Sequence, residues 1–196
     1  IKLGYNFKSK TDSEVILIAW QEWKEKSILM LNGMFSFVIF DRKLNELILV
    51  RDRYGIKPLY YYYSHDSFYF GSEQKAIFEN PKLNKNLNYA AVLEYMTFQN
   101  IFTDQTLNNN CKILKAGYYA KLNLNNKKFD QYKYWDFNFN SISEKNIIYE
   151  EYEEELERLT KQAVYRQLVS DVEIGSYLSG GMDSGTLASF ATEKIN

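Results

Sequence analysis

The feature that most constrains this chain is a glycine turn placed directly after an apolar run. Ser179-Gly180-Gly181-Met182-Asp183-Ser184 follows residues 174–178, which read Ile-Gly-Ser-Tyr-Leu. Adjacent glycines behind a buried strand permit a tight turn, and the backbone N–H groups of the turn then converge on an anion at the start of the next helix. The sequence therefore predicts a strand, an anion-binding turn and a helix, which is the repeating unit of nucleotide-binding α/β domains.

The side chains of this turn suit a pyrophosphate. Ser179 and Ser184 supply hydroxyl donors for phosphate oxygens, and the Asp183 carboxylate can hold Mg²⁺ between phosphates. A Walker loop would need a lysine before its Ser or Thr, and a dinucleotide loop would need three spaced glycines. The plain alternative is a Ser/Gly turn that joins a strand to a helix. Two serines and an aspartate around the glycines favour the pyrophosphate loop over that alternative.

Composition excludes several classes of protein. The formal net charge is -1 and there is no Lys/Arg stripe, so we expect no nucleic-acid partner. The longest apolar stretches have the length of a strand, far below the roughly 20 residues that span a bilayer, so we expect no membrane segment. One cysteine, Cys111, makes no internal disulfide, which favours a cytoplasmic location. Ile1 and Asn196 both look like cut ends, since the last predicted helix has only about three turns.

Hydrophobic periodicity predicts antiparallel sheets followed by helices. A capping box at residues 11–14 starts a helix that reaches about residue 26. Further helices are expected at 73–78, at 89–98 with Asn88 as cap, and at 147–169, where an apolar side should pack on the strand at 174–178. The expected strands lie at 34–40, 46–50, 60–63, 68–70, 112–114, 118–122 and 131–135. Four consecutive tyrosines at 60–63 should alternate between the two faces of their strand.

Several motifs, in order along the chain, resemble the glutamine-dependent asparagine synthetase family. Besides the loop at 179–184, they are 11–16 (Thr-Asp-Ser-Glu-Val-Ile), 31–37 (Leu-Asn-Gly-Met-Phe-Ser-Phe), 51–60 (Arg-Asp-Arg-Tyr-Gly-Ile-Lys-Pro-Leu-Tyr), 71–76 (Gly-Ser-Glu-Gln-Lys-Ala) and 170–172 (Ser-Asp-Val). The resemblance implies an α+β chain. A partial αββα sandwich of the N-terminal-nucleophile (Ntn) hydrolase type comes first, and the start of an α/β PP-loop ATP-pyrophosphatase domain follows. The expected boundaries are a glutaminase domain at 1–136, a linker at 137–146 and the ATP-binding domain from 147 to 196.

The resemblance also implies an activity. Glutamine is hydrolysed in the first domain, and its ammonia reaches the second domain. There ATP activates aspartate as a β-aspartyl adenylate, which ammonia converts to asparagine. The implied ligands are glutamine, aspartate, ATP and Mg²⁺, and a homodimer is left open.

The same resemblance assigns roles to individual residues. Ser179, Gly180, Gly181, Asp183 and Ser184 match the pyrophosphate loop, with Asp183 as Mg²⁺ ligand, and Leu178 stands where the family contacts adenosine. Asp12 matches the aspartate that holds the α-amino group of glutamine. Without the family, an aspartate in a capping box would be assigned to stabilisation of the first helical turn.

The departures from the family pattern are equally informative. The family nucleophile is an N-terminal cysteine, and this chain starts with Ile1, so no catalytic residue is assigned and the chain by itself is expected to be inactive. Cys111 is expected to be a buried, inert thiol, His65 an exposed turn residue, and Arg51 with Asp52 a structural ion pair. Two other functions stay open: an amidotransferase for a sugar or other carboxylate, and a catalytically dead remnant that acts as a binding module.

Overall fold

The computed structural model describes residues 3–64, 66–139 and 148–195. The chain divides into two compact units, Ile1–Phe137 and Asn138–Asn196, which are described separately. His65, most of the expected linker at 137–146 and the expected first residue of the helix at 147 lie outside the described residues.

The first unit contains two antiparallel sheets. One has four strands in the order β1-β2-β6-β7, and the other has three in the order β4-β3-β5. The strands are β1 (Ser36–Asp41), β2 (Glu46–Arg51), β3 (Tyr60–Tyr63), β4 (Phe68–Gly71), β5 (Cys111–Ile113), β6 (Tyr118–Asn123) and β7 (Phe129–Lys133). The helices are α1 (Asp12–Trp23), α2 (Lys26–Met30), α3 (Gln74–Ile77) and α4 (Tyr89–Phe98). Each expected strand and helix of this unit is confirmed, with ends that differ by at most three residues, and α2 is an additional helix that the sequence analysis does not predict.

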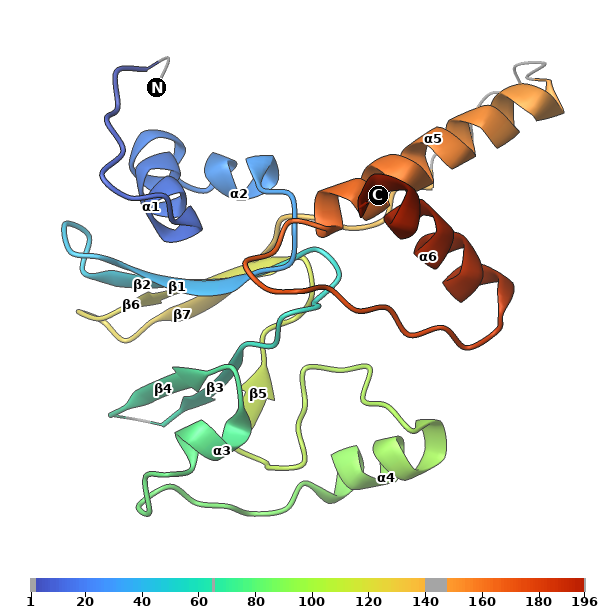
Figure 1. The fold of residues 1–196 in the computed structure, drawn as a ribbon. Helices are drawn as coiled ribbons and strands as arrows, with labels where there is room; N and C mark the ends of the chain where they lie inside the picture. The colour runs from blue at the N-terminus through green and yellow to red at the C-terminus, as the bar shows by residue number, and fades with distance from the viewer. Residues whose placement is uncertain (1–2, 65, 140–147, 196) are drawn as a thin grey trace. The chain divides into compact units, whose positions relative to one another are not determined.

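Three groups of buried side chains show how the layers stack. The first group joins α1 and α2 to the four-stranded sheet and contains Trp20, Ile28, Ile39, Ile48 and Val50. The second lies between the two sheets and contains Leu49, Leu59, Tyr61, Leu114 and Ala120. The third joins the three-stranded sheet to α3 and contains Tyr62, Ile77 and Cys111. Figure 1 shows the resulting order of helices, sheet, sheet and helix, which confirms the expected αββα sandwich.

Strand β2 shows why this sequence forms a two-sided sheet. Ile48 and Val50 belong to the core under the helices, while Leu49 between them belongs to the core between the sheets. Successive side chains of a strand point to opposite faces, so an unbroken apolar run fills two cores. The same alternation places Tyr61 between the sheets and Tyr62 against α3, as the sequence predicts.

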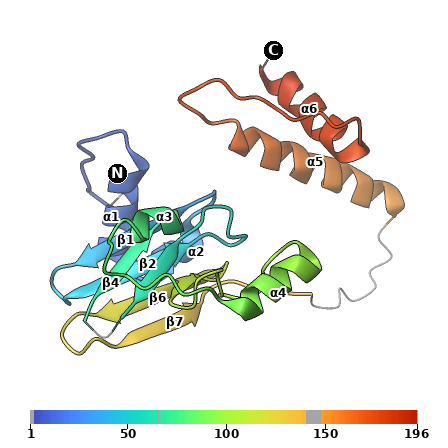
Figure 2. The same ribbon diagram turned by 90° about the horizontal axis from the view of Figure 1, so that it is seen from below.

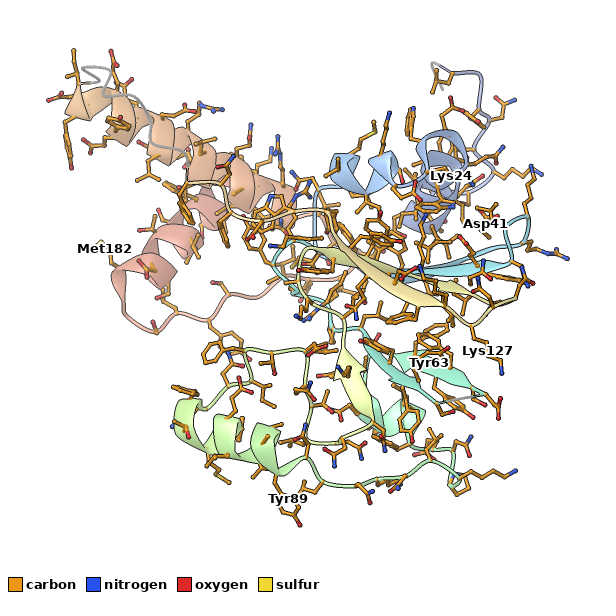
Figure 3. All side chains as sticks on the ribbon, turned by 180° about the vertical axis from the view of Figure 1, so that it is seen from behind. Lys24, Asp41, Tyr63, Tyr89, Lys127 and Met182 are labelled. Carbon is orange, nitrogen blue, oxygen red and sulfur yellow. The ribbon has the colours of Figure 1, made fainter. Side chains whose placement is uncertain are left out.

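An ion pair joins the helix layer to the first sheet. Lys24 Nζ lies 2.8 Å from Asp41 Oδ2 at the end of β1, and Trp20 Nε1 donates to the same oxygen at 3.4 Å. Figure 3 labels Lys24 and Asp41 at this junction. The partners lower the pKa of Asp41 to about 2, with the hydrogen bond from Lys24 as the largest cause. This carboxylate therefore stays ionised and fastens α1 to the sheet.

The second unit consists of α5 (Tyr149–Gln167) and α6 (Met182–Ile195), which lie side by side in Figures 1 and 2. Lys161 pairs with Glu193 at 3.3 Å and lies 5.1 Å from the ring centroid of Phe190. Lys194 in turn lies 5.6 Å from the ring centroid of Tyr165. Lys161, Tyr165 and Phe190 are half-buried by these contacts, and neither helix has a fully buried residue.

The strand expected at residues 174–178 is not formed, and this prediction is wrong for the described chain. Tyr177 is 100% exposed and Leu178 is 68% exposed. A strand is stable only where neighbouring strands take up its backbone N–H and C=O groups, and the described part of this unit contains no other strand. The expected packing of α5 on that strand fails for the same reason, since Leu156 and Leu159 are exposed.

No helix in the described ranges is both long and apolar enough to cross a membrane.

Candidate functional site

The predicted pyrophosphate loop leads directly into α6. Gly180 has φ +82°, a backbone conformation that residues with a side chain rarely adopt, so glycine suits this point of the turn. Helix α6 begins at Met182, and the Gly185 N–H donates to the Gly181 carbonyl at 3.0 Å. The N–H groups of the first helical turn have no acceptor inside a helix and are available to an anion.

The two loop serines lie against each other. Ser179 Oγ and Ser184 Oγ are 2.9 Å apart, and the Ser179 N–H donates to Ser184 Oγ at 3.3 Å. Ser184 Oγ also donates to the Gly181 carbonyl at 3.1 Å. The fold thus brings both predicted phosphate donors to one point beside the glycines.

Asp183 lies in the first turn of α6, next to these hydroxyls. Its side chain is exposed and makes no hydrogen bond or ion pair with the residues described here. Nor do the described ranges contain a group of three or more His, Cys, Asp or Glu side chains that could hold a metal ion. A lone carboxylate suits Mg²⁺, which keeps several waters and takes its other ligands from substrate phosphates. Leu178, the predicted adenosine contact, is exposed just before the loop.

Asp12, the predicted glutamine ligand, is the first residue of α1 in the first unit. Its side chain is exposed and has no partner within the described ranges. The expected capping box does not form, because Thr11 makes no side-chain cap and the Glu14 carboxylate accepts the N–H groups of Lys8 and Ser9 instead. Glu14 reaches past Thr11 into the preceding loop, a contact that the spacing of residues 11–14 does not predict.

The structural role of Arg51 and Asp52 differs from the expected ion pair. Asp52 is 1% exposed and accepts four backbone N–H groups, from Phe35, Tyr54, Ile56 and Lys57. Arg51 donates to the carbonyls of Gly55, Lys57 and Leu114. Each side chain therefore satisfies backbone groups of the turn after β2, and no direct salt bridge joins the two within the described chain. Their adjacency in the sequence suggests a pair, and only the turn geometry shows otherwise.

Cys111 is buried in the third core, and burial raises the pKa of its thiol to about 11. A thiol with so little thiolate is a poor nucleophile. The structure agrees with the expected inert cysteine.

Two protein families match this chain, one in each of its two units. Residues 1–135 match the glutamine amidotransferase domain family, and residues 155–196 match the asparagine synthase family. The glutamine-hydrolysing asparagine synthetase 2 of Bacillus subtilis is 34% identical over 97% of this chain and 27% of its own length. A putative glutamine-hydrolysing asparagine synthetase 2 of Methanocaldococcus jannaschii is 33% identical over 98% of this chain and 37% of its own length.

Among solved structures, a glutamine phosphoribosylpyrophosphate amidotransferase from B. subtilis matches with a TM-score of 0.47 and 16% identity. That match covers 98% of this chain and 40% of the other.

The first unit is a glutamine amidotransferase domain, since the family match covers most of the chain and fits the αββα sandwich. The chain therefore belongs to the glutamine amidotransferase domain family. Over nearly its whole length, with the asparagine synthase match behind the first unit, it is similar to glutamine-hydrolysing asparagine synthetases. The chain spans about a third or less of the length of most curated relatives it matches, at 27% for the B. subtilis protein.

Proposed function

We propose that this chain is part of a glutamine-dependent ligase that makes asparagine from aspartate and ATP. The observation that carries the proposal is the order of two matches on one chain. The amidotransferase match at 1–135 precedes the asparagine synthase match at 155–196, and the second match contains the loop at 179–184. A nitrogen-donating domain followed by an ATP-binding loop is the arrangement that a glutamine-dependent ligase requires.

In the proposed first half-reaction, glutamine is hydrolysed to glutamate and ammonia. Asp12 would bind the α-ammonium group of glutamine, because its carboxylate is exposed and has no partner in the described chain. An ionised acceptor facing an ammonium forms a short, strong hydrogen bond. This contact selects an amino acid over an amide that lacks the α-amino group.

In the proposed second half-reaction, an oxygen of the aspartate side-chain carboxylate attacks the α-phosphorus of ATP and pyrophosphate leaves. Ammonia then attacks the acyl carbon of the β-aspartyl adenylate, which gives asparagine and AMP. Ser179, Ser184 and the N–H groups around Gly180 and Gly181 would hold the pyrophosphate, and Leu178 would contact the adenosine. Asp183 would hold Mg²⁺, which neutralises the charge that develops on the leaving group.

Further parts of the proposal concern organisation. We place the glutaminase domain at 1–136, a linker at 137–146 and the ATP-binding domain at 147–196. A cytoplasmic location also stays a proposal, and it rests on the single cysteine of this chain.

The test is to express the complete reading frame and to measure AMP, pyrophosphate and asparagine formation from ATP and glutamine, with and without aspartate. We expect pyrophosphate release that depends on aspartate and yields asparagine. Turnover that ignores aspartate would favour a different carboxylate acceptor, such as a sugar acid. A protein that releases no ammonia from glutamine and no pyrophosphate from ATP would favour the non-catalytic binding module.

A further inference from the structure

Glu14 clamps the loop that leads into α1. Its Oε1 accepts the Lys8 N–H at 2.8 Å, and its Oε2 accepts the Ser9 N–H at 2.6 Å and the Ser9 hydroxyl at 2.5 Å. One carboxylate thus receives three hydrogen bonds from two consecutive residues of the loop. Hydrogen bonds to an ionised acceptor are the stronger kind.

The clamp extends from Ser9 to the residue before Asp12. Ser9 Oγ accepts the Thr11 N–H at 3.3 Å and lies 2.9 Å from Thr11 Oγ1. Because the single hydroxyl proton of Ser9 goes to Glu14, Thr11 is the donor in the second contact. The chain is therefore fixed from Glu14 through Ser9 to Thr11, and Asp12 is the next residue.

These contacts also separate the roles of the two carboxylates in the first turn of α1. Both oxygens of Glu14 are used by the protein, and the bonds from the Lys8 N–H and from the Ser9 hydroxyl and N–H lower the pKa of Glu14. The Asp12 carboxylate has no such partners within the described residues. An incoming cation at this turn therefore finds one available carboxylate instead of two competing ones.

We propose that Glu14 is the positioning residue for Asp12 and, through it, sets the selectivity of the site for glutamine over amides without an α-amino group. The inference rests on the proposed function. Glu14 does not touch the substrate in this account: it fixes the backbone from which Asp12 projects, and Asp12 makes the contact.

The experiment uses the complete protein and two substrates, glutamine and glutaramate, which is glutamine without its α-amino group. For each variant, kcat/KM for ammonia release is measured with both substrates, and turnover with free ammonium is measured as a check that the ATP-dependent reaction is intact. The variants are Asp12→Asn, Glu14→Ala, Glu14→Gln and the double change of Asp12→Asn with Glu14→Ala. Glu22→Ala is the matched control, since Glu22 lies on the same helix and accepts the Tyr5 hydroxyl, which is not among the loop residues that Glu14 holds.

We expect Asp12→Asn to reduce the preference for glutamine over glutaramate by about tenfold to a hundredfold, which corresponds to one lost charge-assisted hydrogen bond. Glu14→Ala should reduce the same ratio by about tenfold, while Glu14→Gln, which keeps one acceptor oxygen, should fall between Glu14→Ala and the unchanged protein. In the Asp12→Asn background, Glu14→Ala should cause no further loss, because the residue through which it acts is already changed. Glu22→Ala and turnover with ammonium should match the unchanged protein.

Several outcomes would overturn the inference. If Asp12→Asn lowers the ratio and Glu14→Ala does not, the glutamine-binding role of Asp12 stands and the positioning role of Glu14 is wrong. Losses that add in the double variant would show that Glu14 acts independently of Asp12. If Asp12→Asn leaves the ratio unchanged, the proposed role of Asp12 fails, and the inference falls with it.

Discussion

The guanidinium of Arg51 lies directly against the backbone of Gly55. Arg51 Nη2 donates to the Gly55 carbonyl at 2.6 Å, and a Cβ atom added at Gly55 would lie 2.9 Å from Arg51 Cζ. Gly55 also has φ +66°, which residues with a side chain rarely adopt. The turn after β2 thus needs glycine both for its backbone conformation and for the space that Arg51 fills.

Replacement of Gly55 by alanine should therefore lower the free energy of unfolding by about 2–4 kcal/mol, from backbone strain together with the steric clash. Urea unfolding followed by tryptophan fluorescence would measure it. Gly4→Ala is the matched control, because Gly4 has φ +83° but no atom within 4 Å of an added Cβ. Its loss should be only about 1 kcal/mol. Equal losses of unfolding free energy at the two positions would show that the clash with Arg51 adds nothing to the destabilisation.

Asp52→Asn should destabilise the first unit by about 2–4 kcal/mol, because an amide replaces a buried carboxylate that accepts four backbone N–H groups. The asparagine NH₂ group would face N–H donors and leave some of them without an acceptor. The same unfolding measurement applies. Asp130→Asn, which removes a partly exposed partner of Lys128, should change stability by less than about 0.5 kcal/mol. If Asp52→Asn left the free energy of unfolding unchanged, the role given to this carboxylate would be wrong.

The Lys24–Asp41 pair predicts a dependence of stability on pH. The pKa of Asp41 falls from 3.8 to about 2 on folding, so the folded state favours the ionised carboxylate. Its contribution is fully present above about pH 4 and is lost as the pH falls toward 2. Urea unfolding across this window should show a shallower loss of stability for Asp41→Asn than for the unchanged protein. Parallel curves would mean that the pair does not shift the titration of Asp41.

Asp183→Asn should reduce aspartate-dependent pyrophosphate release by the complete protein about a hundredfold or more, if Asp183 holds the metal that stabilises the leaving group. Ammonia release from glutamine should be spared, because Asp183 belongs to the second unit. Glu154→Gln, at an exposed carboxylate of α5 in the same unit, is the control and should leave both activities unchanged. Equal loss of both activities in Asp183→Asn would contradict the division of labour between the units.

Much of the first unit could be predicted from the sequence, because its strands have partners within the chain. The four consecutive tyrosines of β3 and the apolar run of β2 predict strands with hydrophobic side chains on both faces. Both strands have hydrogen-bonded neighbours in their sheets. The strand expected at 174–178 was likewise predicted from local sequence, and it does not form. Local periodicity indicates what a segment can form, but a strand also requires neighbouring strands. The described part of the second unit contains none.

Side-chain partners were harder to predict than elements. The spacing from Thr11 to Glu14 is that of a capping box, yet Glu14 bonds to Lys8 and Ser9. Arg51 and Asp52 are adjacent and opposite in charge, yet each bonds to backbone groups. In both cases the competing partners are backbone groups of a loop, whose direction depends on turn geometry that spacing alone does not determine.

Strand β2 also limits where this domain can change in length. Leu49 and Val50 are neighbours in sequence but belong to different cores. One residue inserted within β2 would move every later side chain of the strand to the wrong core. Length variation among natural relatives should therefore concentrate in the exposed turns at 42–45 and 124–127, where added residues disturb neither core.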